Sequence, residues 1–365
     1  MSAQVSYKKQ ITFGILLLII ILLVFEGALR IYDYYNPNCN FISSDVYSDI
    51  DNELKRWICL DNDNVKWIDF PYLHLEPNQH LTTININNDG FRGNDISLEK
   101  SPNTYRIFVV GGSTTFGVGS SSDATTIPGY LQNYFQEYTD LNVQVINAGI
   151  PKAYSYTETN YIKNILFQYE PDLFIVYDGW NDLGRSSDSY FEGGGAPSLF
   201  EKITRGLFNS GYYNTEKILW KNYSNWRATY VEHVKLINFD DIDERVNLWK
   251  NSWTELCELS TKKNVDVIIT LQPLVGTGNK ELTDEEIGTY KFYNQDHVLP
   301  NYEKYFIALE DLGIICSKSK DLRNIFDDRT ETIFFDKGHV GDLGNQIIAK
   351  ELFELSLPIL KEKTQ

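Results

Sequence analysis

Short apolar runs alternate along most of this chain with longer segments whose apolar residues recur at helical spacing. Buried parallel strands have the first pattern, and the helices that cover them have the second. The alternation predicts a three-layer α/β domain, in which helices cover both faces of a five-stranded parallel sheet. The predicted strands are Ile107–Val110, Val143–Ile146, Leu173–Tyr177, Val265–Leu271 and Gly313–Cys316.

The amphipathic segments between and after these runs predict the covering helices. In the last segment Ile348, Leu352 and Leu355 share one helical face, and Pro358 is expected to end the helix. The predicted helices span about 126–138, 157–169, 243–262, 284–311 and 342–357.

One segment near the N-terminus is apolar on every side. The run from Ile11 to Phe25 is almost wholly apolar, and residues 11–30 reach the roughly 20 residues that a bilayer-spanning helix needs. Lys8 precedes the run, so charge bias places residues 1–10 in the cytoplasm and the bulk of the chain outside it. A cleaved signal peptide is the alternative, but the residues after Phe25 match its small-residue cleavage site poorly.

Residues 31–100 are rich in Tyr, Asn and Asp, and we expect them to form a stalk or cap before a catalytic domain at 101–360. Within this region Leu81–Ile86 alternates like a strand and leads into Asn88-Asp89-Gly90, a sequence typical of tight turns. Arg92 follows that turn. It is either part of the turn or a group that reaches an anionic part of a substrate.

The interval at about 183–263 is longer than a simple crossover between parallel strands, which needs about a dozen residues. Its many aromatic side chains are expected to form either a small satellite core or a pocket for an acyl or glycan group. The interval also holds the glycosylation sequon Asn222-Tyr223-Ser224, which is usable only in an exported domain.

Acidic residues outnumber basic ones 50 to 33, so the formal net charge is −17. A surface of this charge repels phosphate backbones, which excludes nucleic acid as a partner. The oligomeric state stays open.

The four cysteines are Cys39, Cys59, Cys257 and Cys316, and they lack the Cys or His spacing of a metal site. We therefore expect no metal and no other cofactor. Cys39 and Cys59 are either joined by a disulfide, which an exported domain allows, or unpaired. Cys257 and Cys316 are expected to be ordinary buried thiols.

Small and polar residues gather where the predicted strands end, which is the ligand-binding edge of a parallel α/β sheet. Ser113, Gly149 and Asn181 follow three successive strands, and Asp336 and His339 precede the last helix. These residues match the parts of a serine esterase. Ser113 is the candidate nucleophile, His339 its base and Asp336 the acid that orients His339. The N–H groups of Ser113 and Gly149, with the Asn181 amide, are the candidate oxyanion donors.

Four sequence blocks resemble the signature of the SGNH hydrolases, also called GDSL-like lipases and acylhydrolases. They are Gly-Gly-Ser-Thr-Thr-Phe-Gly around Ser113, Asn-Ala-Gly ending at Gly149, Gly-Trp-Asn-Asp around Asn181, and Asp-Lys-Gly-His from Asp336 to His339. The resemblance covers about 105–357. It implies a small flavodoxin-like sheet and the same five residue roles.

One position departs from the family pattern, because Gly112 stands where the family has Asp. That Asp is not a catalytic group in the family, so the departure leaves the predicted activity in place. Thr115 stands where the nucleophile elbow of the α/β-hydrolases would have Gly, which argues against that other fold.

Three functions fit these residues. The first is hydrolysis of an ester on a lipid or glycan, such as deacylation or deacetylation, through an acyl-enzyme on Ser113. The second is O-acyl transfer to an extracytoplasmic glycan, because the same acyl-enzyme can pass its group to a sugar when water is excluded. The third is a non-catalytic binding module tethered to the membrane.

Overall fold

The computed structural model describes residues 6–35, 39–68, 71–191 and 237–364. Its first helix, α1 (Tyr7–Tyr35), contains a stretch, Tyr7–Leu29, that is long and apolar enough to cross a membrane. The mean hydropathy of this stretch is 2.7, and none of it is buried in the protein. By length and composition α1 can serve as the expected anchor, although a signal sequence meets the same criteria. The orientation in the membrane stays a prediction.

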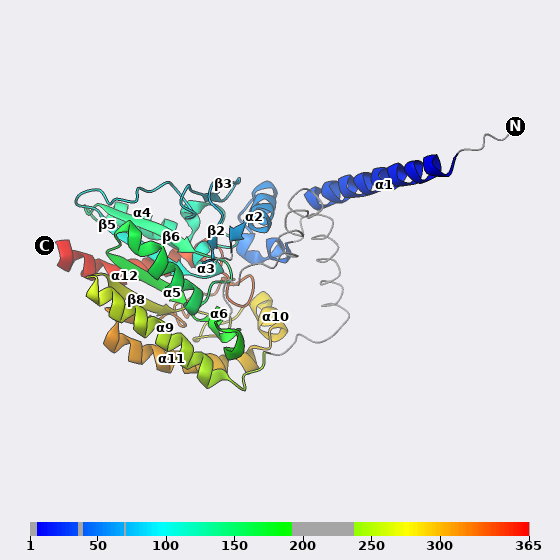
Figure 1. Cartoon of the computed structure of the whole chain (residues 1–365). Coiled ribbons are helices and arrows are strands. Elements are labelled where there is room, and N and C mark those ends of the chain that lie inside the picture. Colours follow the sequence, from blue (N-terminus) through cyan, green and yellow to red (C-terminus); the bar gives the residue numbers. More distant parts are fainter. Residues whose placement is uncertain (1–5, 36–38, 69–70, 192–236, 365) are drawn as a thin grey trace. The chain divides into compact units, whose positions relative to one another are not determined.

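A five-stranded sheet forms the centre of the compact unit that begins at Asn40 (Figure 1). Neighbouring strands are parallel throughout, in the order β6-β5-β7-β8-β9. Numbered along the chain, this is the 2-1-3-4-5 order of flavodoxin-like sheets, so the predicted fold class is confirmed. The strands are β5 (Tyr105–Gly111), β6 (Val143–Gly149), β7 (Leu173–Asp178), β8 (Asp266–Leu271) and β9 (Lys318–Asp321).

Helices cover both faces of the sheet, because successive side chains of each strand point to opposite sides. Ile107 of β5 lies in one core and its neighbour Phe108 lies in the other. Residues of α4 and α12 complete the first core, and residues of α5, α9 and α11 complete the second (Figure 1). These helices are α4 (Ile127–Tyr138), α5 (Ser155–Asn164), α9 (Ile242–Lys262), α11 (Gln295–Ile315) and α12 (Asp342–Thr364).

The prediction of the fifth strand is wrong. Gly313–Cys316 lies at the carboxyl end of α11, which runs to Ile315 and buries Leu312 completely. The strand that completes the sheet is the polar segment β9. Because β9 is an edge strand, it tolerates the charged side chains that a central strand excludes, and it carries no apolar run.

Three of the predicted helices also differ from the observed ones. In the segment 157–169, α5 ends at Asn164 and a 3-10 helix covers Leu166–Tyr169. The segment 284–311 holds two helices, α10 (Asp284–Phe292) and α11, separated where Asn294 adopts a left-handed backbone with φ of 50°. Pro358 does not end the last helix, since α12 continues to Thr364. Leu360, beyond the proline, is fully buried, and its burial outweighs the hydrogen bond that the proline removes.

Residues 40–100 fold into short elements of the same compact unit as the sheet. The predicted turn is present, and the N–H of Gly90 donates to the carbonyl of Asn87 at 3.2 Å. β1 pairs with β2, and β3 with β4, in small antiparallel pairs. The elements are the 3-10 helices Asn40–Ser43 and Asp45–Tyr47, α2 (Asn52–Asn64), β1 (Trp67–Ile68), β2 (His74–Leu75), β3 (Gln79–His80) and β4 (Asn85–Ile86).

Cys257 and Cys316 form a disulfide, so the prediction of two free buried thiols is wrong. The Cα atoms of the pair are 5.1 Å apart, and the bond links α9 to the residue that follows α11. The two cysteines are 59 residues apart in sequence, and only the packing of α9 against α11 brings them together. The Cys39–Cys59 pairing stays a prediction.

The aromatic insertion predicted at 183–263 is described at its two ends. The 3-10 helix Ser187–Ser189 lies near its start, and α9 completes it, as predicted for 243–262. The sequon at Asn222 lies outside the described residues. Both interpretations of the insertion, pocket and satellite core, therefore stay predictions.

Candidate active site

Ser113 stands at the carboxyl edge of the sheet, where the strand order reverses. It is the first residue of a one-turn helix, α3 (Ser113–Phe116), which follows β5. The neighbouring strand β7 leads into another one-turn helix, α6 (Trp180–Leu183), which carries Asn181. In sheets of this order, ligands bind in the crevice between the first and third strands. Ser113 and Asn181 therefore flank the expected binding crevice.

Gly112 allows the Asn181 amide to approach the backbone beside Ser113. A Cβ atom added to Gly112 would overlap Nδ2 of Asn181, which explains why this position carries no side chain. The same Nδ2 donates to the carbonyl of Ala153 at 2.6 Å. Because an amide nitrogen has two donors, one N–H of Asn181 is left for another acceptor.

Asp336 and His339 share one loop, which its own hydrogen bonds hold in place. Phe334 and Val340 form an antiparallel bridge across the base of the loop. Oδ1 of Asp336 accepts the backbone N–H of Gly338 at 2.9 Å and that of His339 at 2.7 Å. The carboxylate is thus oriented by the backbone of the loop that carries the imidazole.

A continuous chain of hydrogen bonds joins Asp336, His339 and Ser113. Oδ2 of Asp336 lies 2.7 Å from Nδ1 of His339, and Nε2 of the same ring lies 2.7 Å from Oγ of Ser113. The serine is 226 residues away from the histidine in sequence. The fold therefore brings together the three residues that sequence spacing proposed as nucleophile, base and acid. Both side chains of the pair are partly buried, with 19% of His339 and 26% of Asp336 exposed.

Asp336 is held as a carboxylate. Burial alone would raise the pKa of Asp336, but the charge of His339 and the hydrogen bonds from the loop outweigh burial and lower the pKa to about 2. The group therefore remains an acceptor for Nδ1–H of His339 at any pH near neutrality, which leaves Nε2 free to accept a proton from Ser113.

Aromatic residues from the segment 40–100 support the loop that carries Asp336 and His339. The ring of Phe335 stacks on the ring of His339 with centroids 5.7 Å apart and planes 9° apart. Tyr47 and Phe41 pack in turn against Phe335. The hydroxyl of Tyr47 donates to the carbonyl of Gly119 at 2.9 Å, which fixes this small cluster. No sequence signal linked these rings to the site, because their contacts join segments nearly 300 residues apart.

Gly149 is not presented as an oxyanion donor. Its N–H donates to Oδ1 of Asn147 at 3.0 Å, so the amide is already engaged within β6. A Cβ atom added to Gly149 would overlap the backbone nitrogen of Phe116. The glycine therefore lets α3 pack closely against the end of β6, and its contribution to the site is steric.

The hollow beside Ser113 is small, with about 10 Å³ of room among the described residues, which is enough for about one water molecule. Five of its lining residues had no predicted catalytic role, although four of them stand inside the quoted motifs. Trp180 belongs to Gly-Trp-Asn-Asp and Lys337 to Asp-Lys-Gly-His, while Gln272 follows β8. The hollow is lined by Ser113, Thr114, Trp180, Asn181, Gln272, Lys337, Gly338 and His339.

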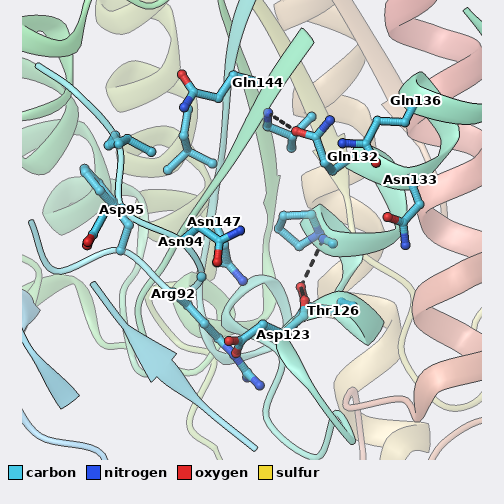
Figure 2. Close-up of a pocket in the computed structure, with 18 residues that line it drawn as sticks. Arg92, Asn94, Asp95, Asp123, Thr126, Gln132, Asn133, Gln136, Gln144 and Asn147 are labelled. Carbon is cyan, nitrogen blue, oxygen red and sulfur yellow. Dashed lines mark hydrogen bonds and ion pairs between the residues drawn. The ribbon is translucent and has the colours of Figure 1, made fainter. Parts of the chain in front are cut away.

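A larger cavity, of about 580 Å³, lies away from this hollow along the edge strand β6. Figure 2 shows Gln132, Asn133 and Gln136 on the α4 side of the cavity and Gln144 and Asn147 on the β6 side. Ser113, Asp336 and His339 are not among its lining residues. Within the described chain, no group of three or more His, Cys, Asp or Glu side chains is placed to hold a metal ion.

Arg92 lines that cavity with its backbone region, but its guanidinium serves the fold. Nε pairs with Asp123 at 2.7 Å, and the terminal nitrogens donate to the carbonyls of Thr83, Phe116 and Gly117. The side chain is fully buried. Of the two alternatives, reach toward a substrate anion is therefore wrong, because every nitrogen already has a partner. Arg92 instead fixes the end of α3, the helix that begins with Ser113.

Comparisons with known proteins give neighbours by structure. No protein-family model matches the chain, and no curated protein matches it either. Among solved structures, the acetylxylan esterase Axe2 of Geobacillus stearothermophilus is 15% identical, with a TM-score of 0.43, over 68% of this chain and 93% of that one. A candidate GDSL-like lipase of Parabacteroides merdae is 13% identical, with a TM-score of 0.41, over 68% and 94%. By name, these two neighbours are an acetylxylan esterase and a GDSL-like lipase.

Proposed function

We propose that this protein is a serine-dependent esterase that works through an acyl-enzyme on Ser113. The observation that carries the proposal is the hydrogen-bond chain from Asp336 through His339 to Ser113, with both imidazole contacts at 2.7 Å. A serine hydroxyl is a weak nucleophile unless a base is in place to take its proton. Here the base is in place, and the acid behind it sets its tautomer.

The reaction follows from these positions. Oγ of Ser113 attacks the ester carbonyl while Nε2 of His339 takes its proton, which gives a tetrahedral oxyanion and an imidazolium balanced by Asp336. The imidazolium then protonates the departing alcohol, and the acyl group stays on Ser113. A water molecule repeats the two steps in the second half, releasing the carboxylic acid and restoring the hydroxyl.

The oxyanion needs donors at the mouth of the hollow. The N–H of Ser113 is the first of α3 and has no partner within that helix, and the second N–H of Asn181 is free of the Ala153 carbonyl. We assign the oxyanion to these two donors and omit Gly149, whose N–H is engaged. Preorganised donors of this kind are each worth about 2.7–4 kcal/mol of transition-state stabilisation.

Among the described residues, the hollow beside Ser113 has about 10 Å³ of room, so no cleft for a long acyl chain is formed there. We therefore propose deacetylation of an extracytoplasmic glycan or a similar small-acyl ester as the reaction. The proposed location is supported by α1 and by the Cys257–Cys316 disulfide, because disulfides persist in oxidising compartments.

The test uses the full-length protein in detergent with a fluorophosphonate probe and a chromogenic acetate ester. We expect the wild type and Ser97→Ala, a change at an exposed serine, to be labelled and active, and Ser113→Ala to be neither. No labelling of the folded wild type would refute the serine mechanism. Product analysis with a sugar acceptor present then separates hydrolysis from acyl transfer.

A further inference from the structure

Lys337 is one of the residues that line the hollow beside Ser113. The residue lies between Asp336 and Gly338, and it lines the hollow together with Trp180 and His339. None of the catalytic steps above uses it. Its position therefore requires a separate account.

Two aromatic rings hold the amine in place. Nζ of Lys337 lies 4.2 Å from the centroid of the Trp180 ring and 5.2 Å from that of the Tyr293 ring. Trp180 belongs to α6, and Tyr293 lies between α10 and α11. Cation–π contacts of this kind fix the position of an ammonium group but leave its N–H donors unused.

The amine has no anionic partner in the part of the chain that the structure describes. No carboxylate lies within ion-pair distance of Nζ, and Nζ donates no hydrogen bond to another described residue. The neighbouring carboxylate of Asp336 is committed to His339 and to the loop backbone. Burial lowers the pKa of Lys337, and the charge of Asp336 opposes this change.

Other buried cations contrast with Lys337, because their nitrogens donate hydrogen bonds. Arg106 donates to Gln144 and to the carbonyls of Leu98 and Tyr169. Three others each have a carboxylate partner at hydrogen-bond distance. The pairs are Arg92–Asp123, Arg245–Asp241 and Lys280–Glu286.

We propose that Lys337 recognises a negative charge on the substrate, next to the ester that Ser113 attacks. The substrate class is then an acylated molecule that carries a carboxylate or phosphate beside the scissile ester, such as an acidic glycan. The inference rests on the proposed esterase function. With a net charge of −17, the protein as a whole repels such substrates, so a cation at the site is what selects them.

The experiment compares anionic esters with neutral ones of similar size. One pair differs on the acyl side, 4-nitrophenyl hydrogen succinate against 4-nitrophenyl butyrate. The other pair differs on the alcohol side, a sulfonated aryl acetate against the unsubstituted aryl acetate. The two pairs therefore show on which side of the scissile bond the charge is recognised. The variants are Lys337→Met, which keeps the stem against the rings, and Lys337→Arg, which keeps the charge.

A matched control is Lys263→Met, which removes another lysine that lies over a ring, that of Phe167, at a distance of 5.1 Å and away from the hollow. We expect the wild type to prefer one anionic ester in kcat/KM by about ten- to a hundredfold, the range of a charged hydrogen bond. Lys337→Met should abolish that preference, mainly through KM, while Lys337→Arg and Lys263→Met keep it.

Two results would overturn the inference while the esterase proposal stands. One is turnover of neutral esters with no preference for either anionic ester. The other is a preference that persists in Lys337→Met. An equal loss on anionic and neutral esters in Lys337→Met would show a packing role and also overturn it. If no ester is hydrolysed and Ser113 is not labelled, the proposed function fails and the inference falls with it.

Discussion

Replacing Asp336 by Asn tests whether the acid acts by setting the tautomer of His339. In the native loop Oδ1 of Asp336 accepts two backbone N–H groups, at 2.9 and 2.7 Å, and Oδ2 faces Nδ1 of His339. An asparagine must keep its single oxygen on the two backbone donors. Its NH₂ group then faces Nδ1, which has to become an acceptor.

This change at Nδ1 alters the protonation of Nε2, the ring nitrogen that faces Ser113. With Nδ1 as acceptor, the imidazole proton moves to Nε2, which lies 2.7 Å from Oγ of Ser113 and can no longer take the hydroxyl proton. The same tautomer change in a serine protease lowers kcat about 10⁴-fold. That factor corresponds to about 5 kcal/mol of activation free energy, and we expect a loss of the same order in Asp336→Asn.

The assay measures kcat on a chromogenic acetate ester and the rate of fluorophosphonate labelling. Asp328→Asn is the matched control, because Asp328 is an exposed carboxylate that precedes the catalytic loop. Thermal melting checks that both variants are folded. If Asp336→Asn keeps more than a tenth of the wild-type kcat while folded, the role of Asp336 in orienting His339 is refuted.

Two predictions concern stability. The double change Cys257→Ala and Cys316→Ala opens a loop of 59 residues and should lower the free energy of unfolding by about 4 kcal/mol in urea titration; a loss below about 1 kcal/mol would contradict the loop-entropy account. Glu158 of α5 is fully buried, and neither of its carboxylate oxygens has a hydrogen-bond partner among the described residues. Burial is the main cause that raises the pKa of Glu158 well above its usual value, and the charges of Asp178 and Asp182 add to it. Folding therefore favours the protonated form, so stability is present at acidic pH and falls as pH rises through the folded pKa. Glu158→Gln should shrink the difference in melting temperature between pH 5 and pH 8, and an unchanged difference would refute this assignment.

The spacing of apolar residues predicted the strands and helices that bury a continuous face. Four strands and the main helices have apolar periodicity, since each buries a continuous face, and the structure contains them. β9 escaped prediction because an edge strand needs no apolar face, and its sequence Lys318–Asp321 carries none. The Cys257–Cys316 bond escaped it because the pairing depends on how α9 packs against α11.

The residues of the candidate site also differ in how far the sequence alone could predict them. Ser113, Asn181 and the Asp336/His339 pair follow strand ends or share a short loop, so position in the sequence was enough to place them near one another. Gly149 stands at a strand end too, but position does not say where an N–H points. That N–H turns toward Asn147, a fact that depends on the side-chain conformation of a neighbour.

Residues of the segment 40–100 support the candidate site through packing and hydrogen bonds. Arg92 holds the carbonyls of Phe116 and Gly117 at the end of α3, and Tyr47 packs on Phe335, the ring that stacks against His339. Ser113 and His339 are thus both supported by a region whose composition predicted only a stalk or cap. The compact unit that contains the candidate site therefore begins at Asn40, and the contacts from this segment are buried within it. Substrate selection is instead expected to depend on residues that line the hollow, such as Lys337 and Trp180.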